Sequence, residues 1–385
     1  MIRFSFALLS FWCSVSIFGC GNSGTDGGYP TANPAQSTLD PSGSVTFTAP
    51  RSTPAPISCT GRKIGTYAWS QAYWRGNDDS LITFLDSSAG RAWACGDLSI
   101  NVADYTNPDQ IHDSDALVNF IQNYRIRVAN PDTVVWLTYG DVVEKSAEKM
   151  IRFTNTFFAW ASSIPADIAD SMGTIGISFD VEHIDPAATK TALQTAQQLR
   201  SQTKFKPGSI LIQHTIEGDP NVAGTEYVME YADSALAMVY RNYMHDPSGK
   251  YQDDSNLLNR LLWMLTSQCS HCMDEAYVRA NYRAKITVMV EAACKMGASC
   301  GKVSMCAFDG ANQGAIYMAG VLDQMEAELY PTKISESLRK ALFNEKTPYA
   351  VHNWEWYRCF APFSSSFSFE SCSTYHQEAA SCRNL

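Results

Sequence analysis

The chain has 385 residues, a formal net charge of −10 and an aromatic content of 12%. Its length fits one large domain with appendages or two ordinary domains. The acidic balance and the lack of any basic run exclude nucleic acids and anionic membrane surfaces as expected partners, because phosphates are bound by clustered lysine and arginine.

The N-terminus has the pattern of an export signal. Arg3 precedes an apolar stretch at 4–18 that is too short to span a bilayer, and small residues follow. We expect residues 1–21 to be a signal peptide and the mature protein to be secreted. The alternative is a lipid anchor on Cys20, which loosely fits a bacterial lipoprotein cleavage site. No later stretch of about 18 uninterrupted apolar residues occurs, so we expect no membrane insertion.

Residues 22–58 have the composition of a flexible linker. Ser, Thr, Pro and Gly occupy 22 of these 37 positions. Such a segment cannot bury enough apolar surface to order itself.

Ten cysteines lie beyond the signal, and this even number predicts up to five disulfides in an exported chain. Cys269-Ser-His-Cys272 has the spacing of half a zinc site or of a redox motif. No second Cys-x-x-Cys pair completes a metal cage. We therefore expect these two cysteines to form disulfides with other partners, and we expect neither a metal nor a cofactor.

Strand and helix patterns alternate after Cys59. The expected strands are 63–69, 80–86, 133–140, 174–182, 209–216, 235–243, 285–293 and 349–357. The helical stretches between them include 114–127, 145–164, 187–201 and 314–330. This alternation predicts an α/β fold, an eightfold (β/α) TIM-type barrel over residues 59–357. A doubly wound open sheet is the competitor, but no glycine-rich phosphate loop follows the first strand. Residues 358–385 carry three cysteines and are expected to form a tail stapled to the barrel by disulfides.

The expected strand 174–182 alternates between two kinds of side chain. The bulky apolar face consists of Ile175, Ile177, Phe179 and Val181. The other face, small at first and then acidic, consists of Gly176, Ser178, Asp180 and Glu182. In a barrel the bulky face packs against helices, and acids at the C-terminal end of the strand lie where catalytic groups belong.

This strand resembles the fourth barrel strand of glycoside hydrolase family 18, the chitinases and related endo-β-N-acetylglucosaminidases. Their strand ends in Asp-Gly-x-Asp-x-Asp-x-Glu. The segment IGISFDVE matches it at Gly176, Asp180 and Glu182, and departs from it at Ile175 and Ser178, where the family usually has Asp.

Other expected strands resemble the same family in order. The first one would place Tyr67 among the substrate-binding residues. Met238 and Tyr240 match the family's Met-x-Tyr, although Arg241 stands where Asp usually follows. Trp354 falls where the family keeps the tryptophan that floors the sugar subsite.

Asp180 and Glu182 are two residues apart on a strand, so both side chains point into one cleft at about 6–7 Å separation. Most retaining glycosidases need a second carboxylate on the opposite face of the sugar, whereas this pair suits a substrate whose 2-acetamido group is the nucleophile. Glu182 would then protonate the glycosidic oxygen while Asp180 orients the acetamido group. The resemblance implies that Tyr240 hydrogen-bonds the acetamido oxygen and that Trp354 stacks beneath the sugar. Ser178 cannot hold the proton that the family's Asp shares, so we expect slowed turnover.

We therefore expect a secreted, monomeric, chitinase-like glycosidase that binds and cleaves β-linked N-acetylglucosamine glycans. One alternative is a chitinase-like carbohydrate-binding protein without chemistry. A second is a two-glutamate retaining β-glycanase that uses Glu182 and Glu291. A third, metal-dependent phosphodiester hydrolysis, would draw ligands from a set of strand-end residues: Glu182, His183, Asp185, His214 and Glu217.

Overall fold

The computed structural model describes Gln377 and most of residues 62–359. Within that range, the residues outside the description are 88–89, 92, 105–106, 129, 131, 142–146, 182–184, 218–223, 240–256, 293–294, 297–298, 301–321, 324, 345–347 and 353.

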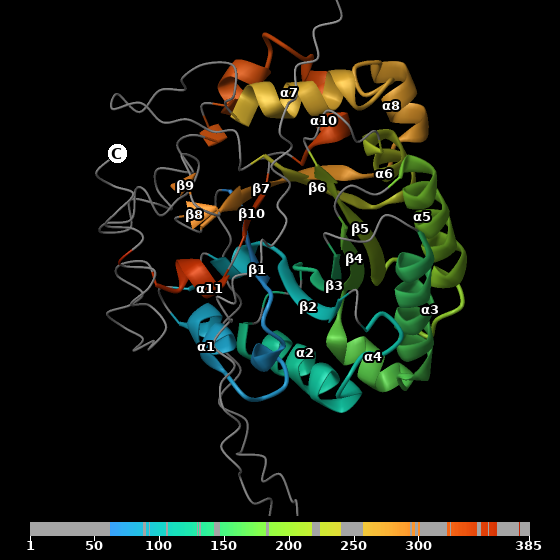
Figure 1. Ribbon diagram of the computed structural model, residues 1–385, viewed down its shortest axis with the longest axis vertical. Coiled ribbons are helices and arrows are strands. Elements are labelled where there is room, and N and C mark those ends of the chain that lie inside the picture. The colour runs from blue at the N-terminus through green and yellow to red at the C-terminus, as the bar shows by residue number, and fades with distance from the viewer. Residues whose placement is uncertain are drawn as a thin grey trace, which may run out of the picture. The chain divides into compact units, whose positions relative to one another are not determined.

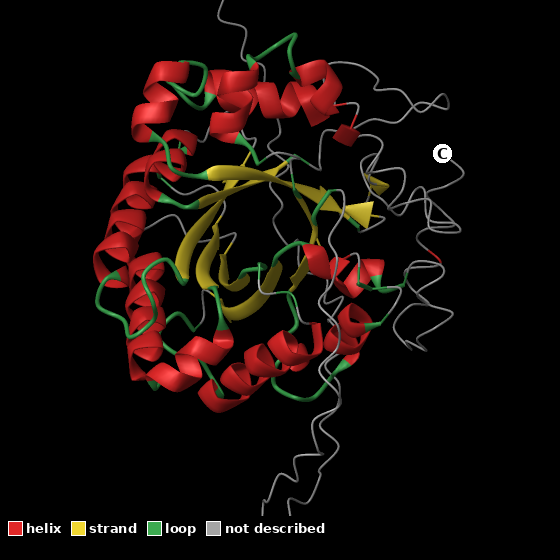
Figure 2. Ribbon diagram, turned by 180° about the vertical axis from the view of Figure 1, so that it is seen from behind, coloured by secondary structure: helices red, strands yellow, loops and turns green. Residues whose placement is uncertain are grey.

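Eight parallel strands close into a barrel in the order β1-β10-β7-β6-β5-β4-β3-β2. Figure 2 shows them as a closed ring surrounded by helices. The strands are β1 (Ile64–Ala68), β2 (Leu98–Asp104), β3 (Val135–Asp141), β4 (Ile175–Val181), β5 (Ile210–Glu217), β6 (Ser234–Met238), β7 (Lys285–Glu291) and β10 (Tyr349–His352). A separate antiparallel pair joins β8 (Lys295–Met296) and β9 (Ser299–Cys300). The predicted TIM-type barrel is confirmed.

The helices lie outside the strands (Figure 1). They are α1 (Ser80–Asp86), α2 (Ser114–Val128), α3 (Ala147–Ser163), α4 (Ala166–Met172), α5 (Pro186–Arg200), α6 (Thr225–Tyr231), α7 (Leu257–Ser267), α8 (Glu275–Asn281), α10 (Glu336–Leu342) and α11 (Trp354–Tyr357). Two short 3₁₀ helices span Gln71–Tyr73 and Trp93–Cys95. No helix in the described part of the chain is long and apolar enough to cross a membrane.

One expected strand was wrong and another was missed. Residues 80–86 form α1, because the apolar residues of SLITFLD bury one face at helical spacing: Leu81, Ile82, Phe84 and Leu85. The second barrel strand is instead β2, whose sequence LSINVAD alternates apolar and polar residues at its start. The helices expected at 114–127, 145–164 and 187–201 correspond to α2, α3 and α5. Most of the helix expected at 314–330 lies outside the described residues.

The barrel has an outer core and an inner one. The outer core lies between strands and helices and contains the bulky face of β4; there the Phe179 ring meets Phe153 of α3 edge to face, with centroids 6.3 Å apart. The inner cluster fills the barrel with Tyr67, Leu236, Met238, Met289 and Ala350, and Trp69 packs against it. The small and acidic face of β4 therefore points into the interior, as its alternation predicts.

Candidate functional site

Parallel strands of a closed barrel end on one side, and inward side chains at those ends share one space. Three such side chains come from different strands: Tyr67 near the end of β1, Asp180 near the end of β4 and His352 at the end of β10. Tyr67 and His352 are direct partners in the β1–β10 register. Their rings lie 5.6 Å apart between centroids.

Asp180 is a buried carboxylate at this end of the barrel, with 6% of its surface exposed. Its Oδ2 accepts a hydrogen bond of 3.0 Å from the hydroxyl of Tyr67, which is fully buried. A carboxylate is placed in a protein interior only at a cost unless it is hydrogen-bonded. The Tyr67 hydroxyl meets part of that requirement and fixes the orientation of Asp180.

Ser178, one inward position below Asp180, belongs to a neutral network. Its hydroxyl donates to Oε1 of Gln213 on β5 at 2.9 Å, and the Gln213 amide donates to the hydroxyl of Ser234 on β6 at 3.0 Å. Ser178 is fully buried. The interior is thus built for an uncharged residue at the position where family 18 usually carries an acid.

A second group of contacts joins β1 to the last strand and to α11. The indole N–H of Trp69 donates to Nε2 of His352 at 2.6 Å. One carboxylate oxygen of Glu355 accepts the backbone N–H groups of Trp69 and Ser70, both at 2.8 Å. Burial raises the pKa of Glu355, and these two N–H donors oppose the rise. Sequence reasoning missed this group, although inward alternation from Tyr67 to Trp69 was a usable signal.

Of the other expected substrate-binding and catalytic residues, the structure describes some and not others. Met238 is 7% exposed and shares the inner cluster with Tyr67. Glu182 and Tyr240 lie outside the described residues. Trp354 does not continue the last strand, which ends at His352, but begins α11. Its side chain, like that of Glu291 at the end of β7, is outside the description.

Two residues of the metal-dependent alternative have other roles. Asp185 caps α5, where its side chain accepts the backbone N–H groups of Ala187 and Ala188. His214 faces the helices, with its ring 6.0 Å from that of Phe179 between centroids. No group of three or more His, Cys, Asp or Glu residues among the described positions could hold a metal ion. These placements argue against a metal site assembled from Asp185 and His214.

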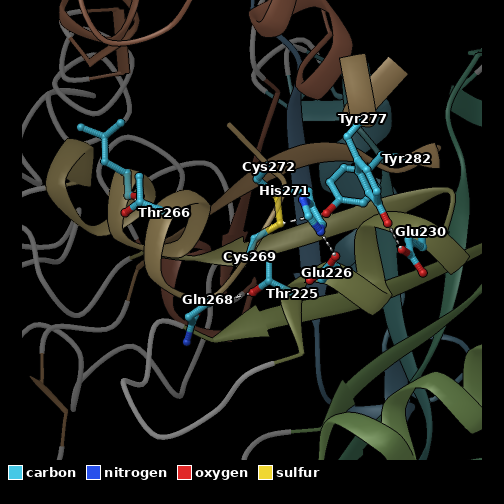
Figure 3. The surroundings of a disulfide bond; sticks show 11 residues. Thr225, Glu226, Glu230, Thr266, Gln268, Cys269, His271, Cys272, Tyr277 and Tyr282 are labelled. Atoms are coloured by element: carbon cyan, nitrogen blue, oxygen red, sulfur yellow. Dashed lines mark hydrogen bonds and ion pairs between the residues drawn. A yellow bond between two sulfur atoms is a disulfide. The ribbon is translucent and has the colours of Figure 1, made fainter. Parts of the chain in front are cut away.

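The Cys269-Ser-His-Cys272 segment is a disulfide in itself (Figure 3). The turn between α7 and α8 brings the two Cα atoms to 5.5 Å, within the usual disulfide range. The expectation of separate partners was therefore wrong. His271, beside the disulfide, stacks on Tyr277 at 4.1 Å between centroids and lies 3.8 Å from a carboxylate oxygen of Glu226. Both sulfur-bearing residues are buried, so we assign this disulfide to the structure of the helix layer.

Two comparisons of the sequence found nothing: it matches no family model and no curated protein. Solved structures do match. Concanavalin B is 11% identical over 84% of this chain and 99% of its own, with a TM-score of 0.44. A xylanase-α-amylase inhibitor protein solved with trehalose is 14% identical over 79% and 97%, also at 0.44. A family 18 chitinase from Pseudoalteromonas aurantia is 12% identical over 82% and 99%, at 0.41. Of these three proteins, one is a family 18 chitinase and another is an inhibitor. The function therefore has to be argued from the site itself.

Proposed function

We propose that this protein is a glycosidase that cleaves β-linked N-acetylglucosamine glycans with the substrate's own acetamido group as nucleophile. The observation that carries the proposal is the buried Asp180 carboxylate, held by Tyr67 inside the C-terminal end of the barrel. Glu182 follows two residues later in the sequence, where a strand would point it to the same side.

The proposed reaction needs both acids. Glu182 donates a proton to the glycosidic oxygen as the acetamido oxygen attacks the anomeric carbon, and the bond to the leaving sugar breaks. Asp180 orients the acetamido group and stabilises the positive charge that develops on its nitrogen. Water then attacks the anomeric carbon, gives a proton to Glu182 and opens the cyclic intermediate, so the anomeric configuration is retained. Tyr240 and Trp354 are proposed to contact the acetamido oxygen and the sugar face.

A second candidate is a carbohydrate-binding protein that has lost turnover. The neutral Ser178–Gln213–Ser234 network favours it, because no residue in that network can share a proton with Asp180. Such a protein would keep the site for N-acetylglucosamine units and release them unchanged.

The organisation outside the barrel is also a proposal. Residues 1–21 would direct export, 22–58 would link, and 358–385 would form the cysteine-containing tail of a secreted monomer. N-terminal sequencing of the secreted protein and its size in solution test this arrangement. A mature protein that still begins at Met1, or that elutes as an oligomer, contradicts it.

Hydrolysis of fluorogenic N-acetylglucosamine oligomers tests the function, with glucose oligomers as the control. Glu182→Gln should lower kcat by about 10²- to 10⁴-fold, because general acid catalysis is lost. Asp180→Asn should also be severe, and Glu291→Gln should be mild. If Glu291→Gln is as damaging as Glu182→Gln while Asp180→Asn is tolerated, the two-glutamate mechanism is correct instead. Tight binding with no turnover in the wild-type protein identifies the carbohydrate-binding alternative.

A further inference from the structure

Trp69, at the C-terminal end of the barrel, fills space that a glycine leaves open. Its ring lies against Gly140 of β3, where an added Cβ would fall 2.3 Å from the indole. Gly140 is the register partner of Asp180 on the neighbouring strand. The Trp69 ring is also 5.1 Å, between centroids, from the ring of Tyr67, which holds Asp180. Trp69 therefore contacts both the strand partner of Asp180 and the ring that binds its carboxylate.

Three separate contacts fix Trp69. Glu355 binds its backbone N–H, His352 accepts its indole N–H, and Gly140 leaves room for the ring. Its inner side packs against the cluster that fills the barrel, yet the residue remains partly exposed. A large aromatic side chain held so firmly, with part of its surface open, is a preorganised binding surface, because ordering it adds little to the cost of binding.

We propose that Trp69 is a stacking surface for a pyranose ring of the substrate, and that His352 is the positioning residue that sets its orientation. This assignment rests on the proposed function. A β-linked sugar with equatorial substituents presents a flat face of C–H groups, which suits an aromatic ring. The indole N–H is already bound by His352, so the open part of Trp69 offers a sugar mainly apolar contact.

The test is calorimetric binding of an N-acetylglucosamine tetramer. Trp69→Ala should weaken the Kd about tenfold or more, as expected when a buried aromatic contact is truncated. Trp69→Phe should lose about threefold or less, since a stacking face remains. Trp160→Phe is the matched control: Trp160 is buried in α3 and donates to Ser114 in the helix layer, so its change should leave the Kd unaltered.

His352 supplies an independent arm of the same experiment. His352→Leu removes the acceptor for the indole N–H and should weaken binding about as much as Trp69→Ala. His352→Gln restores an acceptor and should recover most of the affinity, which a general loss of packing would not.

The outcomes separate this inference from the proposed function. Wild-type binding that Trp69→Ala and His352→Leu leave unchanged overturns the stacking role and leaves the glycosidase proposal standing. Binding that weakens as expected in a protein without turnover supports the stacking role and overturns catalysis. A wild-type protein that neither binds nor cleaves the tetramer overturns both.

Discussion

Each end of the barrel contains a tryptophan packed over a glycine. At the N-terminal end, Trp136 of β3 lies over Gly176 of β4, where an added Cβ would fall 2.2 Å from the ring. Its indole N–H donates to a carboxylate oxygen of Asp97 at 2.9 Å. Trp136 is 1% exposed.

At the C-terminal end a tryptophan also packs against a glycine, but its exposure differs. Trp69 lies over Gly140 and donates its indole N–H to a histidine, but it stays partly exposed. The packing of a large ring against a bare backbone therefore does not distinguish a structural tryptophan from one available to a ligand. The distinction comes from exposure: Trp136 is buried, whereas Trp69 is partly exposed.

At the N-terminal end, a partly buried arginine of α2 contacts several chain termini. The guanidinium of Arg125 donates to the carbonyl oxygens of Met172, Thr133 and Thr174, which lie where α4 ends and where β3 and β4 begin. Burial lowers the pKa of Arg125, and the nearby Asp97 opposes this. Arg125 thereby joins helix and strand termini at this end.

Arg125→Met should have the largest effect on stability, because it removes the donor from several partly buried carbonyl groups. We expect the free energy of unfolding to fall by about 4 kcal/mol, at one to three for each group and with partial relaxation. Urea unfolding measures it, and kcat of the folded fraction should stay unchanged. Arg127→Met is the control on the same helix; its partly exposed pair with Asp86 should be worth about 1 kcal/mol or less. Equal losses for the two variants would show that the N-terminal end does not depend on Arg125.

The two glycines test the comparison directly. Gly176→Ala forces a methyl group against the ring of Trp136, which is 1% exposed, and should cost about 3 kcal/mol. Gly140→Ala should push the partly exposed Trp69 ring away from the strand and break its bond to His352. We expect a cost of about 1 kcal/mol and weaker binding of the N-acetylglucosamine tetramer. Gly224→Ala is the control, since among the residues that the structure describes its added Cβ would meet only Thr189 Oγ1, at 3.9 Å. Two results would show that both ends of the barrel are equally closed to a ligand. One is normal binding by the Gly140→Ala protein, and the other is a loss of stability as large as that of Gly176→Ala.

The barrel could be predicted from local sequence patterns, and the errors in the predicted strands also have a local cause. Strict alternation located β4 and placed Asp180 on its inner face, since one residue of register decides which side chains point inward. Residues 80–86 were misread as a strand because a short apolar run fits both a buried strand and a helix. β2 was missed because it contains the polar residues Ser99 and Asn101, although both are buried inside the barrel.

The site was less predictable, because its contacts are made by closure of the barrel. Tyr67 and Asp180 could be expected from the family resemblance and the alternation. The bond from Trp69 to His352 joins residues 283 positions apart, and only the pairing of the first strand with the last brings them together. No local pattern records that Gly140 makes room for Trp69, or that Glu355 binds the backbone after β1.

His214 adds a third case to the comparison: a polar side chain near the C-terminal ends of the strands that faces the helices. It lies in the C-terminal half of β5, but its side chain points to the helices and is 2% exposed. Its Nδ1 donates to the backbone carbonyl of Thr215 at 2.6 Å. A position near the C-terminal ends of the strands is therefore not enough to place a polar group in the site, and the face of the strand has to be known as well.

The pH dependence of stability tests whether His214 is closed off from solvent. Burial lowers its pKa from 6.5 to about 4, so the folded protein keeps it neutral in a range where the unfolded chain takes up a proton. The free energy of unfolding should therefore decrease as the pH falls from 6.5 towards 4, and this contribution should level off below 4. Between pH 7 and pH 4.5 we expect a loss of about 2 kcal/mol from this residue. Urea unfolding of the wild type and of His214→Asn at both pH values isolates it, because the carboxylates titrate equally in both proteins. If the two proteins lose the same free energy of unfolding, His214 takes up a proton in the folded state and is therefore not closed off from solvent.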